Sequence, residues 1–431
     1  MIAAAVLLPL VWFLPLAGAR DPIAVLSQYF GSVALILMGL SQLMATRWPG
    51  VETVFGGLDR VYVLHKWLGV GALAMILLHD TIDAEMSGLD PVAFLEEIAE
   101  TFGELSLYGI LILVILSVAT MVPYHLWRWT HKFMGGFFAL SAFHYIFIAK
   151  PFSMGSPLGL FLGAFCVIGV LAYAYTLLPM RRLAAQRPYN VQAVERTGGC
   201  IAVTLAPESK GIKHRAGQFA FLNFDHPDLR EAHPFTVSSA PVADGSLRFS
   251  IKPTGDYTND LPTLLKPGMK AAVEGPYGHF IRRSGGALDC CRYRHHAVPC
   301  MAQSLEAQGP AVHLFYCVRN RDEAAHLDEL EALASAHTSL TLHVVESSKS
   351  GRLSAADMQT AVGSDLSQAQ AYFCGPTVMR ESLEAELIGL GLRGSRFHYE
   401  KFEIRSGVGF RKVVAWLLEH FLRLTAKTPR T

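Results

Sequence analysis

The sequence has little charge and no excess of one sign. Charged residues make up 17% of its 431 residues, and the formal net charge at pH 7 is +1, which by itself says nothing about nucleic acid; we predict no nucleic-acid partner. The seven cysteines, three of them clustered, do not have the pattern of a disulfide framework. Hydrophobic residues, in contrast, make up 51% of the chain, and the mean hydropathy is +0.31. This composition is too apolar for an ordinary soluble protein and predicts a membrane protein.

The apolar residues are concentrated before Leu178, and the chain becomes mixed and polar after Arg181. A membrane-spanning helix needs roughly 20 mostly apolar residues. The first candidate ends in Ala17-Gly18-Ala19, which resembles a signal-peptide cleavage site, but it lacks a basic n-region and is interpreted as a span. We predict a six-helix transmembrane bundle over residues 1–180. Its spans lie near 2–19, 23–45, 61–80, 106–122, 131–149 and 157–178.

Lysine and arginine are distributed unequally between the connections, which predicts the orientation in the membrane. The connection from Asp80 to Leu105 has neither residue and holds eight acids, so it should face outward. Within it, Asp90-Pro91 predicts the start of a short surface helix. The opposite side carries the basic residues Arg47, Arg60, Arg128, Lys132, Arg181, Arg182 and Arg187. We predict a multi-pass protein of a bacterial-type plasma membrane, with both termini and the polar half in the cytoplasm.

Two of the predicted spans hold paired histidines. His65 and His79 are fourteen residues apart, and His131 and His144 are thirteen apart. These spacings rise about 21 Å and about 19.5 Å along a helix, and the two spans run in the same direction. Polar groups at membrane depth are costly and indicate function. The pairs His65–His131 and His79–His144 are therefore predicted to bind two b-type haems about 20 Å apart. The alternative is core histidines that are hydrogen-bonded to the backbone.

A thirteen-residue spacing does not keep two side chains on one face of a helix. At 100° per residue it leaves about 140° between His131 and His144, whereas fourteen residues leave about 40°. The fifth span is therefore predicted to bend, to bulge or to reach its haems from different sides. Phe137 or Phe138 lies between the haem levels, where packing and a place in the electron path are the alternatives.

The chain from Pro188 to Phe280 alternates short apolar runs with Gly, Pro and Asp turns, which predicts a small antiparallel barrel. Four motifs follow one another there: GQFAFLNF (217–224), HPFTVSSAP (233–241), SIKPTGDYT (250–258) and EGPYGHF (274–280). Their order and spacing resemble the FAD domain of the ferredoxin-reductase type, and more narrowly that of the ferric reductase and NADPH oxidase family. The resemblance extends over nearly the whole chain and implies an FAD-binding barrel over 186–285.

The resemblance also implies which residues bind FAD. The His-Pro-Phe-Thr motif lines the isoalloxazine and two serines follow it; these residues are His233, Pro234, Phe235, Thr236, Ser238 and Ser239. Lys252 meets the pyrophosphate, with Gly255 and Thr258 close by. A cation and a hydroxyl group suit phosphate oxygens, and glycine lets the backbone approach closely. An ordinary barrel with turn glycines is the alternative.

The residues from 286 to 405 predict an open α/β sheet that binds NAD(P)H. Strand patterns occur at 311–318, 340–345 and 371–376, with a helical pattern at 327–337. Ligands of such sheets bind at the carboxyl ends of the strands.

Several residues at these strand ends are candidates for the nicotinamide site. Arg319 and Arg321 follow the first strand and suit an adenosine phosphate. The resemblance implies a nicotinamide-side turn at Cys374, Gly375 and Pro376, with a redox thiol at Cys374 as the alternative. It also implies that Phe402 is the aromatic residue near the flavin. Residues 406–431 form an amphipathic tail that either lies on the membrane or packs on a domain.

One part of the family's pattern is missing. A strand and a Gly-x-Gly-x-x-Pro loop, whose backbone N–H groups bind the dinucleotide phosphates, should precede the strand at 311–318. The chain has ALDCCRYRHHAVPCMAQSLE at 287–306 instead. Its adjacent cysteines and adjacent histidines lack the two-to-four-residue separation of zinc ligands, so we predict no metal site there.

The genetic code gives a second interpretation of this stretch. When the codons of Cys291 to His296 are shifted by one base, they can encode Ala/Val-Gly-Ile/Thr-Gly-Ile/Thr. A full shifted reading is RWIAAGIGITPFLAW, a buried strand followed by the missing loop. We therefore predict that a base was gained or lost near Gly286 and the frame restored near Leu305, by a sequencing error or a real lesion. A protein with the present sequence should bind nicotinamide weakly and transfer hydride poorly.

Taken together, these patterns predict an NAD(P)H-dependent oxidoreductase that transfers electrons across a membrane. NAD(P)H reduces FAD in the cytoplasm, two haems carry the electrons, and the outer acceptor is ferric iron or dioxygen. Its partners are these small molecules and the lipid membrane. Two alternatives remain: a haem-binding membrane protein with a crippled nucleotide domain, and a multispan protein without haem.

Overall fold

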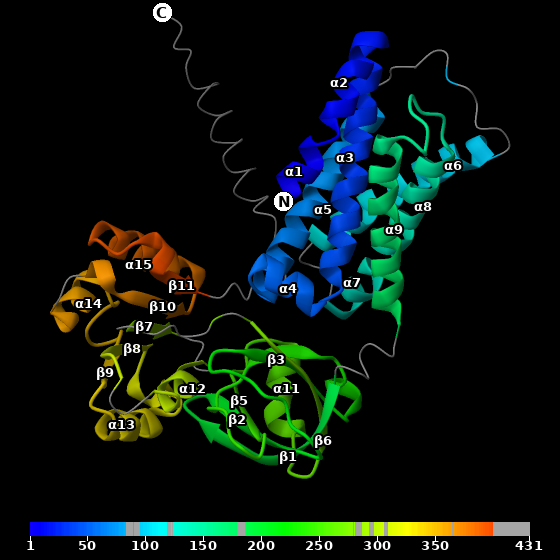
Figure 1. Cartoon of the computed structure of the whole chain (residues 1–431). Helices are drawn as coiled ribbons and strands as arrows, with labels where there is room; N and C mark the ends of the chain where they lie inside the picture. Colours follow the sequence, from blue (N-terminus) through cyan, green and yellow to red (C-terminus); the bar gives the residue numbers. More distant parts are fainter. Residues whose placement is uncertain are drawn as a thin grey trace, which may run out of the picture. The chain divides into compact units, whose positions relative to one another are not determined.

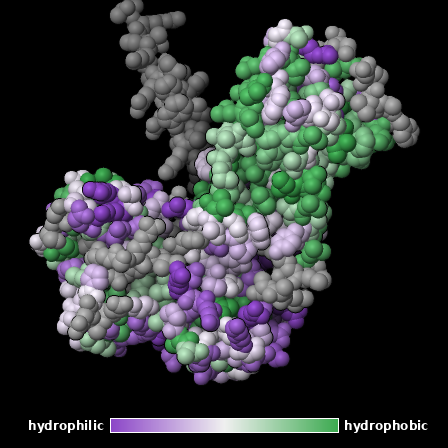
Figure 2. All heavy atoms as spheres, viewed as in Figure 1, coloured by the Kyte–Doolittle hydropathy of each residue, from purple (hydrophilic) through white to green (hydrophobic). Residues whose placement is uncertain are grey.

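The computed structural model describes residues 1–82, 89, 95–118, 122, 124–178, 186–278, 280, 287–292, 297–305, 309–363 and 366–399. The chain divides into a helical unit that contains Met1–Leu178 and a second unit, Pro179–Glu400 (Figure 1). Hydrophobic residues cover most of the visible surface of the helical unit, whereas hydrophilic residues are frequent on the second (Figure 2).

Among its described residues, the helical unit contains five helices that are long and apolar enough to cross a membrane. Capping residues set where two of them begin. The Asp21 side chain accepts a hydrogen bond from the Ile23 N–H, and the Ser156 hydroxyl accepts one from the Gly159 N–H. The five are α1–α2 (Ile2–Leu7 and Leu10–Ala19), α3 (Pro22–Ala45), α5 (Leu58–Thr81), α6 (Glu96–Val118) and α9 (Pro157–Leu177). A short helix, α4 (Pro49–Phe55), precedes α5.

Helix α6 begins ten residues before the predicted fourth span. The acidic connection was expected to continue to Leu105, but its second half forms the first turns of α6, from Glu96. Glu96 and Glu97 lie in the first turn, where carboxylates are favourable next to the positive end of the helix dipole. The surface helix predicted at Asp90-Pro91 lies outside the described residues.

The fifth predicted span, 131–149, is not one continuous helix. Its first residue, His131, ends α7 (Tyr124–His131), and after a turn at Lys132–Phe133 the span continues as α8 (Met134–Phe147). The turn interrupts the helix between His131 and His144, which agrees with the predicted alternatives of a bend or a bulge. Helix α8 has 14 residues and rises about 21 Å, which is less than the roughly 30 Å of a bilayer core.

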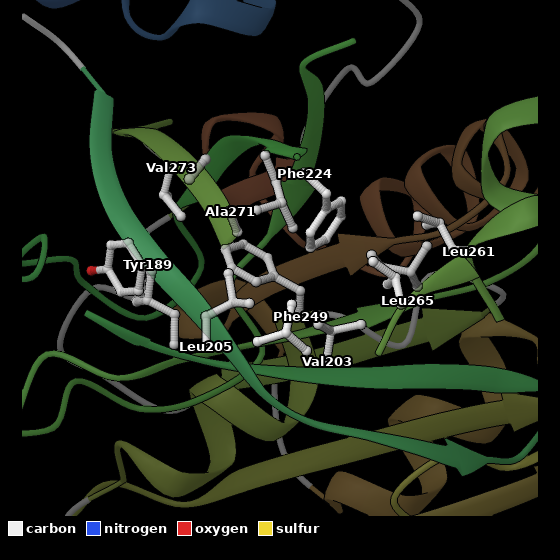
Figure 3. Close-up of a cluster of buried hydrophobic side chains, with 14 of the residues drawn as sticks. Tyr189, Val203, Leu205, Phe224, Phe249, Leu261, Leu265, Ala271 and Val273 are labelled. Carbon is white, nitrogen blue, oxygen red and sulfur yellow. The ribbon is translucent and has the colours of Figure 1, made fainter. Parts of the chain in front are cut away.

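The second unit begins with a six-stranded antiparallel sheet in the order β4-β3-β6-β1-β2-β5. A bridge between Val237 and Phe249 joins the two edges of the sheet. Buried apolar residues such as Tyr189, Leu205 and Phe249 fill its interior (Figure 3). The strands are β1 (Gln186–Thr197), β2 (Cys200–Pro207), β3 (Phe219–Phe224), β4 (His233–Thr236), β5 (Leu247–Ile251) and β6 (Lys270–Tyr277), with helix α11 (Asp256–Leu264) between β5 and β6.

A parallel sheet in the order β11-β10-β7-β8-β9 follows. Its strands are β7 (Ala287–Arg292), β8 (Val312–Val318), β9 (Leu340–Glu346), β10 (Gln370–Cys374) and β11 (Phe397–Tyr399). The strands predicted at 311–318, 340–345 and 371–376 are confirmed as β8, β9 and β10. Four helices belong to this part: α12 (Ala297–Gln303), α13 (Leu327–Ala336), α14 (Ala355–Val362) and α15 (Thr377–Gly389).

The stretch suspected of a shifted frame supplies the central strand of this sheet. Strand β7 pairs in parallel with β8 on one side and with β10 on the other. We expected the present sequence to lack this first strand of the sheet, and this expectation was wrong. The segment forms a strand because β8 and β10 offer it backbone hydrogen bonds along both of its edges. The loop itself, residues 293–296, lies outside the described residues.

Candidate functional site

The helical unit brings the two histidines predicted for one pair together. The ring centroids of His65 on α5 and His131 at the end of α7 are 6.0 Å apart, with an interplanar angle of 74°. Two imidazoles bound through Nε2 to one metal ion at about 2 Å each have centroids about 6 Å apart. The observed separation therefore suits a metal ion bound between the rings. His79 on α5 and His144 on α8 also lie close enough for their charges to interact.

Two serines of α3 hold the histidines of α5. The Ser41 hydroxyl is 2.9 Å from Nδ1 of His65, and its carbonyl oxygen is 3.0 Å from the same atom. Ser27 contacts His79 in the same way: its hydroxyl oxygen and its carbonyl oxygen each lie 2.9 Å from Nδ1 of His79. Ser27 and Ser41 are fourteen residues apart, like the histidines they contact. Because α3 and α5 run antiparallel, each histidine of α5 has a serine of α3 beside it.

Helix α6 holds the other two histidines. The Ser117 hydroxyl donates to the Leu113 carbonyl oxygen at 2.7 Å, so its oxygen accepts the bond from Nδ1 of His131 at 3.2 Å. Nδ1 of His144 donates to the Ala99 carbonyl oxygen at 2.8 Å. A Cβ at Gly103, one turn further along α6, would lie 2.6 Å from that Nδ1, so the close approach of the ring depends on this glycine.

All four histidines therefore use Nδ1 for a hydrogen bond and have Nε2 available for a metal ion. This is the usual arrangement of metal-binding histidines, whose second nitrogen donates to a nearby oxygen. The described residues contain no group of three or more His, Cys, Asp or Glu side chains that suits a metal ion. A haem iron needs only two protein ligands, so the paired histidines fit haem better than a free ion.

In the antiparallel sheet, the His-Pro-Phe-Thr motif forms strand β4, which pairs with β3. The ring of His233 stacks on Tyr257 of α11 with their centroids 3.9 Å apart, and lies 6.5 Å from the ring of Phe235. Burial raises the pKa of the Tyr257 hydroxyl, and the Glu231 carboxylate raises it further. The structure thus joins the motif to α11, a contact that the sequence motifs did not reveal.

The residues predicted for the pyrophosphate gather around the first turn of α11. Thr258 Oγ1 accepts hydrogen bonds from the N–H groups of Thr254 and Gly255, at 2.9 and 3.0 Å. Lys252 lies close enough to Cys200 to oppose the rise that burial causes in the pKa of this thiol. Lys252 precedes the N-terminal end of α11 by four residues, and a lysine and a helix N-terminus each suit an anionic group.

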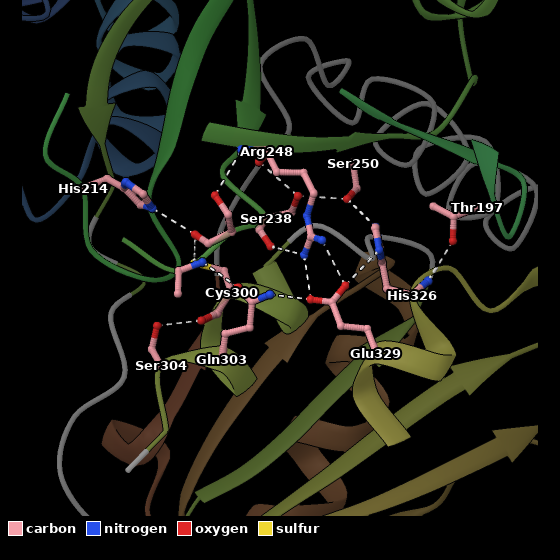
Figure 4. A network of polar contacts seen from close by, with 12 residues as sticks. Thr197, His214, Ser238, Arg248, Ser250, Cys300, Gln303, Ser304, His326 and Glu329 are labelled. Carbon is pink, nitrogen blue, oxygen red and sulfur yellow. Dashed lines mark hydrogen bonds and ion pairs between the residues drawn. The ribbon is translucent and has the colours of Figure 1, made fainter. Parts of the chain in front are cut away.

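Ser238 and Ser239 bond to the neighbouring strand β5. Ser238 is fully buried, and its hydroxyl donates to the Arg248 carbonyl oxygen at 3.0 Å and accepts from Ser250 at 2.9 Å. The Ser239 hydroxyl accepts the bond from the Arg248 N–H at 3.0 Å. Ser238 belongs to a polar network between the two sheets (Figure 4). A role of the two serines at the flavin stays a prediction.

The nicotinamide candidates lie at the carboxyl ends of the parallel strands. Cys374 is the last residue of β10, where it pairs in register with Cys291 of β7, and Gly375 and Pro376 follow it. The chain order of the strands reverses between β7 and β10, which is where ligands of such sheets bind. Arg319 is exposed at the end of β8, whereas Arg321 forms an ion pair with Glu331. Phe402 lies outside the described residues.

Three family models match successive parts of the chain. The model described as a ferric reductase like transmembrane component matches residues 30–142, that of an FAD-binding domain matches 186–280, and that of an oxidoreductase NAD-binding domain matches 298–385. The last match begins after β7. These modules define a membrane-bound flavoprotein oxidoreductase with FAD-binding and NAD(P)-binding domains.

Curated relatives share separate parts of this arrangement. The reductase component of propane 2-monooxygenase from Rhodococcus jostii is 25% identical over 48% of this chain and 60% of its own length. Respiratory burst oxidase homolog protein B from Solanum tuberosum is 39% identical over 19% of this chain and 12% of its own length. With all three modules in one order, the chain is similar to proteins of the ferric reductase and NADPH oxidase family, among them the respiratory burst oxidase homologs. The chain spans about 60% of the length of the first curated relatives it matches.

Solved structures resemble the chain less closely. A ferredoxin NADP+ reductase from Neisseria gonorrhoeae with bound FAD and NADP has a TM-score of 0.43 and 19% identity, covering 51% of this chain and 99% of its own. A flavohemoglobin from Malassezia yamatoensis with bound FAD and heme has a TM-score of 0.48 and 16% identity, covering 88% of this chain and 96% of its own.

Proposed function

We propose that this protein transfers electrons from NAD(P)H on the cytoplasmic side of a bacterial-type plasma membrane to ferric iron or dioxygen on the outer side. The observation that carries the proposal is the set of four membrane histidines, each held through Nδ1, in a chain with FAD-binding and NAD-binding modules. When bound, FAD accepts a hydride and two b-type haems carry single electrons. The chain's own residues hold these groups in position.

His65 and His131 would hold the inner haem, and His79 and His144 the outer one. The contribution of α3 and α6 is to fix the ring orientation of these histidines and to keep the proton on Nδ1. The interruption between α7 and α8 allows one span to present histidines at both levels. We also propose that the helical unit has six membrane spans, that its basic connections face the cytoplasm, and that the antiparallel sheet closes into a barrel.

The hydroxyl of Ser117 is expected to matter more than that of Ser41. In Ser41→Ala the carbonyl oxygen 3.0 Å from His65 remains, whereas Ser117→Ala removes the acceptor that the structure describes for His131. Loss of such a partner weakens metal binding about 10- to 100-fold, so Ser117→Ala should lose inner haem on dilution while Ser41→Ala nearly retains it. Haem absorbance during serial dilution measures this, and equal retention in both variants would contradict it.

The flavin would lie against β4 and α11. His233, Pro234, Phe235 and Thr236 are proposed to line the isoalloxazine, and Lys252, Gly255 and Thr258 to bind the pyrophosphate. The stacking of His233 on Tyr257 supports this, because it connects the motif with the helix whose first turn suits phosphate.

Thr258→Val is expected to weaken FAD binding about fivefold. The substitution removes the oxygen that accepts from two N–H groups at the start of α11, and loss of such a cap costs about 1 kcal/mol. Thr263→Val is the matched control, because its hydroxyl bonds the Asp260 carbonyl oxygen within the same helix, away from that turn. Equilibrium titration of flavin fluorescence measures both, and equal affinities would count against the pyrophosphate site.

NAD(P)H is proposed to bind at the ends of β7 and β10, with Arg319 near the adenosine phosphate and Gly375 and Pro376 near the nicotinamide. Cys374, at the end of β10, and Phe402 are the candidate catalytic residues. The phosphate loop after β7 would be defective in the present reading frame. We keep the hypothesis of a shifted frame, and the start of the NAD-binding match at residue 298 supports it.

One assay tests the proposed activity. Purified protein with added FAD should oxidise NADPH when a ferric chelate or dioxygen is supplied, and the faster acceptor identifies the substrate. A second candidate function is a haem-binding membrane protein with an inactive nucleotide domain, which the unmatched stretch before residue 298 favours. Bound haem without any NADPH oxidation would select this second function.

A further inference from the structure

A polar cluster joins the antiparallel sheet to the parallel sheet within the second unit (Figure 4). His326 lies just before α13 with a positive φ of 57°, which is rare for a residue other than glycine. Its N–H donates to Thr197 Oγ1 at 3.0 Å, and its Nε2 is 2.7 Å from the Ser250 hydroxyl. The side chain is only 8% exposed. Both bonds reach strands of the antiparallel sheet.

An ion pair adds a second connection beside His326. Arg248 of β5 donates from its two terminal nitrogens to the two carboxylate oxygens of Glu329, at 3.0 and 2.9 Å. It also donates to the Ser238 carbonyl oxygen at 3.1 Å. Although burial acts against ionisation, hydrogen bonds from His326 and Arg248 lower the pKa of Glu329 to about 2. The pair is therefore fully charged at neutral pH, and its geometry is the bidentate one that fixes orientation.

The turn between β1 and β2 makes a third connection, by backbone packing. Gly198 has a φ of +48°, and a Cβ placed on it would lie 2.6 Å from the Ala325 Cα. Gly199 has a φ of +73° and nothing within 4 Å of such a Cβ. Only the first glycine is needed for the approach of the two sheets.

We propose that Arg248, His326 and Glu329 are positioning residues that hold the nucleotide-binding sheet against the flavin-binding sheet during hydride transfer. This rests on the proposed function. Ser238, which Arg248 contacts, stands two residues after β4, so a shift at the cluster is transmitted to the strand that would line the flavin. None of these three residues lies between 287 and 306, although Gln303 of that stretch also donates to the Glu329 carboxylate.

The first test compares Gly198→Ala with Gly199→Ala in the full chain. Both variants place a side chain at positive φ, but only Gly198→Ala forces the sheets apart. We expect Gly198→Ala to lower the limiting rate of flavin reduction by NADPH about 10- to 100-fold, because a displacement near 1 Å has effects of this size. The NADPH dissociation constant and the FAD content should stay unchanged. Equal rates in both variants would overturn the proposal.

The second test compares Glu329→Gln with Glu384→Gln. Glu384 forms an ion pair with Arg380 at 3.2 Å within α15, with a similar exposure of 28% against 27%, so it controls for the loss of a carboxylate. Glu329→Gln should accelerate hydrogen exchange at residues 197–199 and 324–330 and slow flavin reduction; Glu384→Gln should do neither. Unchanged exchange, or faster exchange with unchanged flavin reduction, contradicts the proposal. If NADPH does not reduce the flavin of the wild-type protein, the proposed function fails. Hydrogen exchange in Glu329→Gln and Glu384→Gln then tests alone whether the cluster holds the two sheets together.

Discussion

Replacing His65 with leucine should lower the haem content from about two to about one per chain and stop electron transfer from NADPH to the remaining haem. His65 faces His131 at a centroid distance of 6.0 Å, so one substitution removes one of the two proposed ligands of the inner haem. His79 and His144 keep their own partners, Ser27 and Ala99, and the outer haem should persist. Haem extraction and absorbance measure the content, and dithionite should still reduce the haem that remains.

His125→Leu is the control for this experiment. His125 lies in α7, six residues before His131, and belongs to neither predicted pair. Its replacement should leave two haems per chain. A His65→Leu protein that retains two haems, or whose remaining haem is reduced by NADPH as fast as in the wild type, would contradict the assignment of the inner pair.

Restoring the shifted reading frame between Gly286 and Leu305 should increase NADPH-driven flavin reduction by roughly 100-fold or more. The shifted sequence RWIAAGIGITPFLAW provides a strand at the position of β7 and a Gly-x-Gly-x-x-Pro loop in the residues that follow it. Each backbone N–H bond to a charged phosphate contributes about 1.5–3 kcal/mol, so two regained bonds account for this factor. Stopped-flow measurement of flavin reduction, in the present and the restored chain, tests the prediction.

The restored chain should keep its FAD and haem content, because residues 186–278 and the helical unit are unchanged. Resequencing of the gene provides an independent result. A read that preserves the present frame, with codons that cannot encode the loop, would refute the shifted frame. A restored chain that is no faster than the present one would show that the loop is not what limits hydride transfer.

The sequence predicted the helical and mixed parts of the fold because their patterns are local. Apolar runs marked the long helices, and the thirteen-residue spacing of His131 and His144 indicated an irregular helix, of which the break between α7 and α8 is one form. The start of α6 was misplaced by ten residues, because acidic residues near Glu96 were interpreted as a solvated connection rather than as the first turn of a helix.

The partners of the site residues could not be predicted, because they come from distant parts of the chain. The contacts between Ser41 and His65 and between Arg248 and Glu329 depend on how whole helices and sheets pack. One signal was present in the sequence: Ser27 and Ser41 repeat the fourteen-residue spacing of the α5 histidines. The strand at β7 was missed because its pairing with β8 and β10, rather than its own residues, determines its structure.

A reduced-minus-oxidised absorption spectrum of the purified protein tests the central claim most directly. The spectrum is recorded after addition of NADPH with FAD and again after dithionite. We predict b-type haem bands of about two haems per chain after dithionite, and a slow or partial appearance of the same bands after NADPH in the present reading frame. A dithionite spectrum without b-type bands would contradict the account, because it would leave the four paired histidines without the group they are proposed to bind.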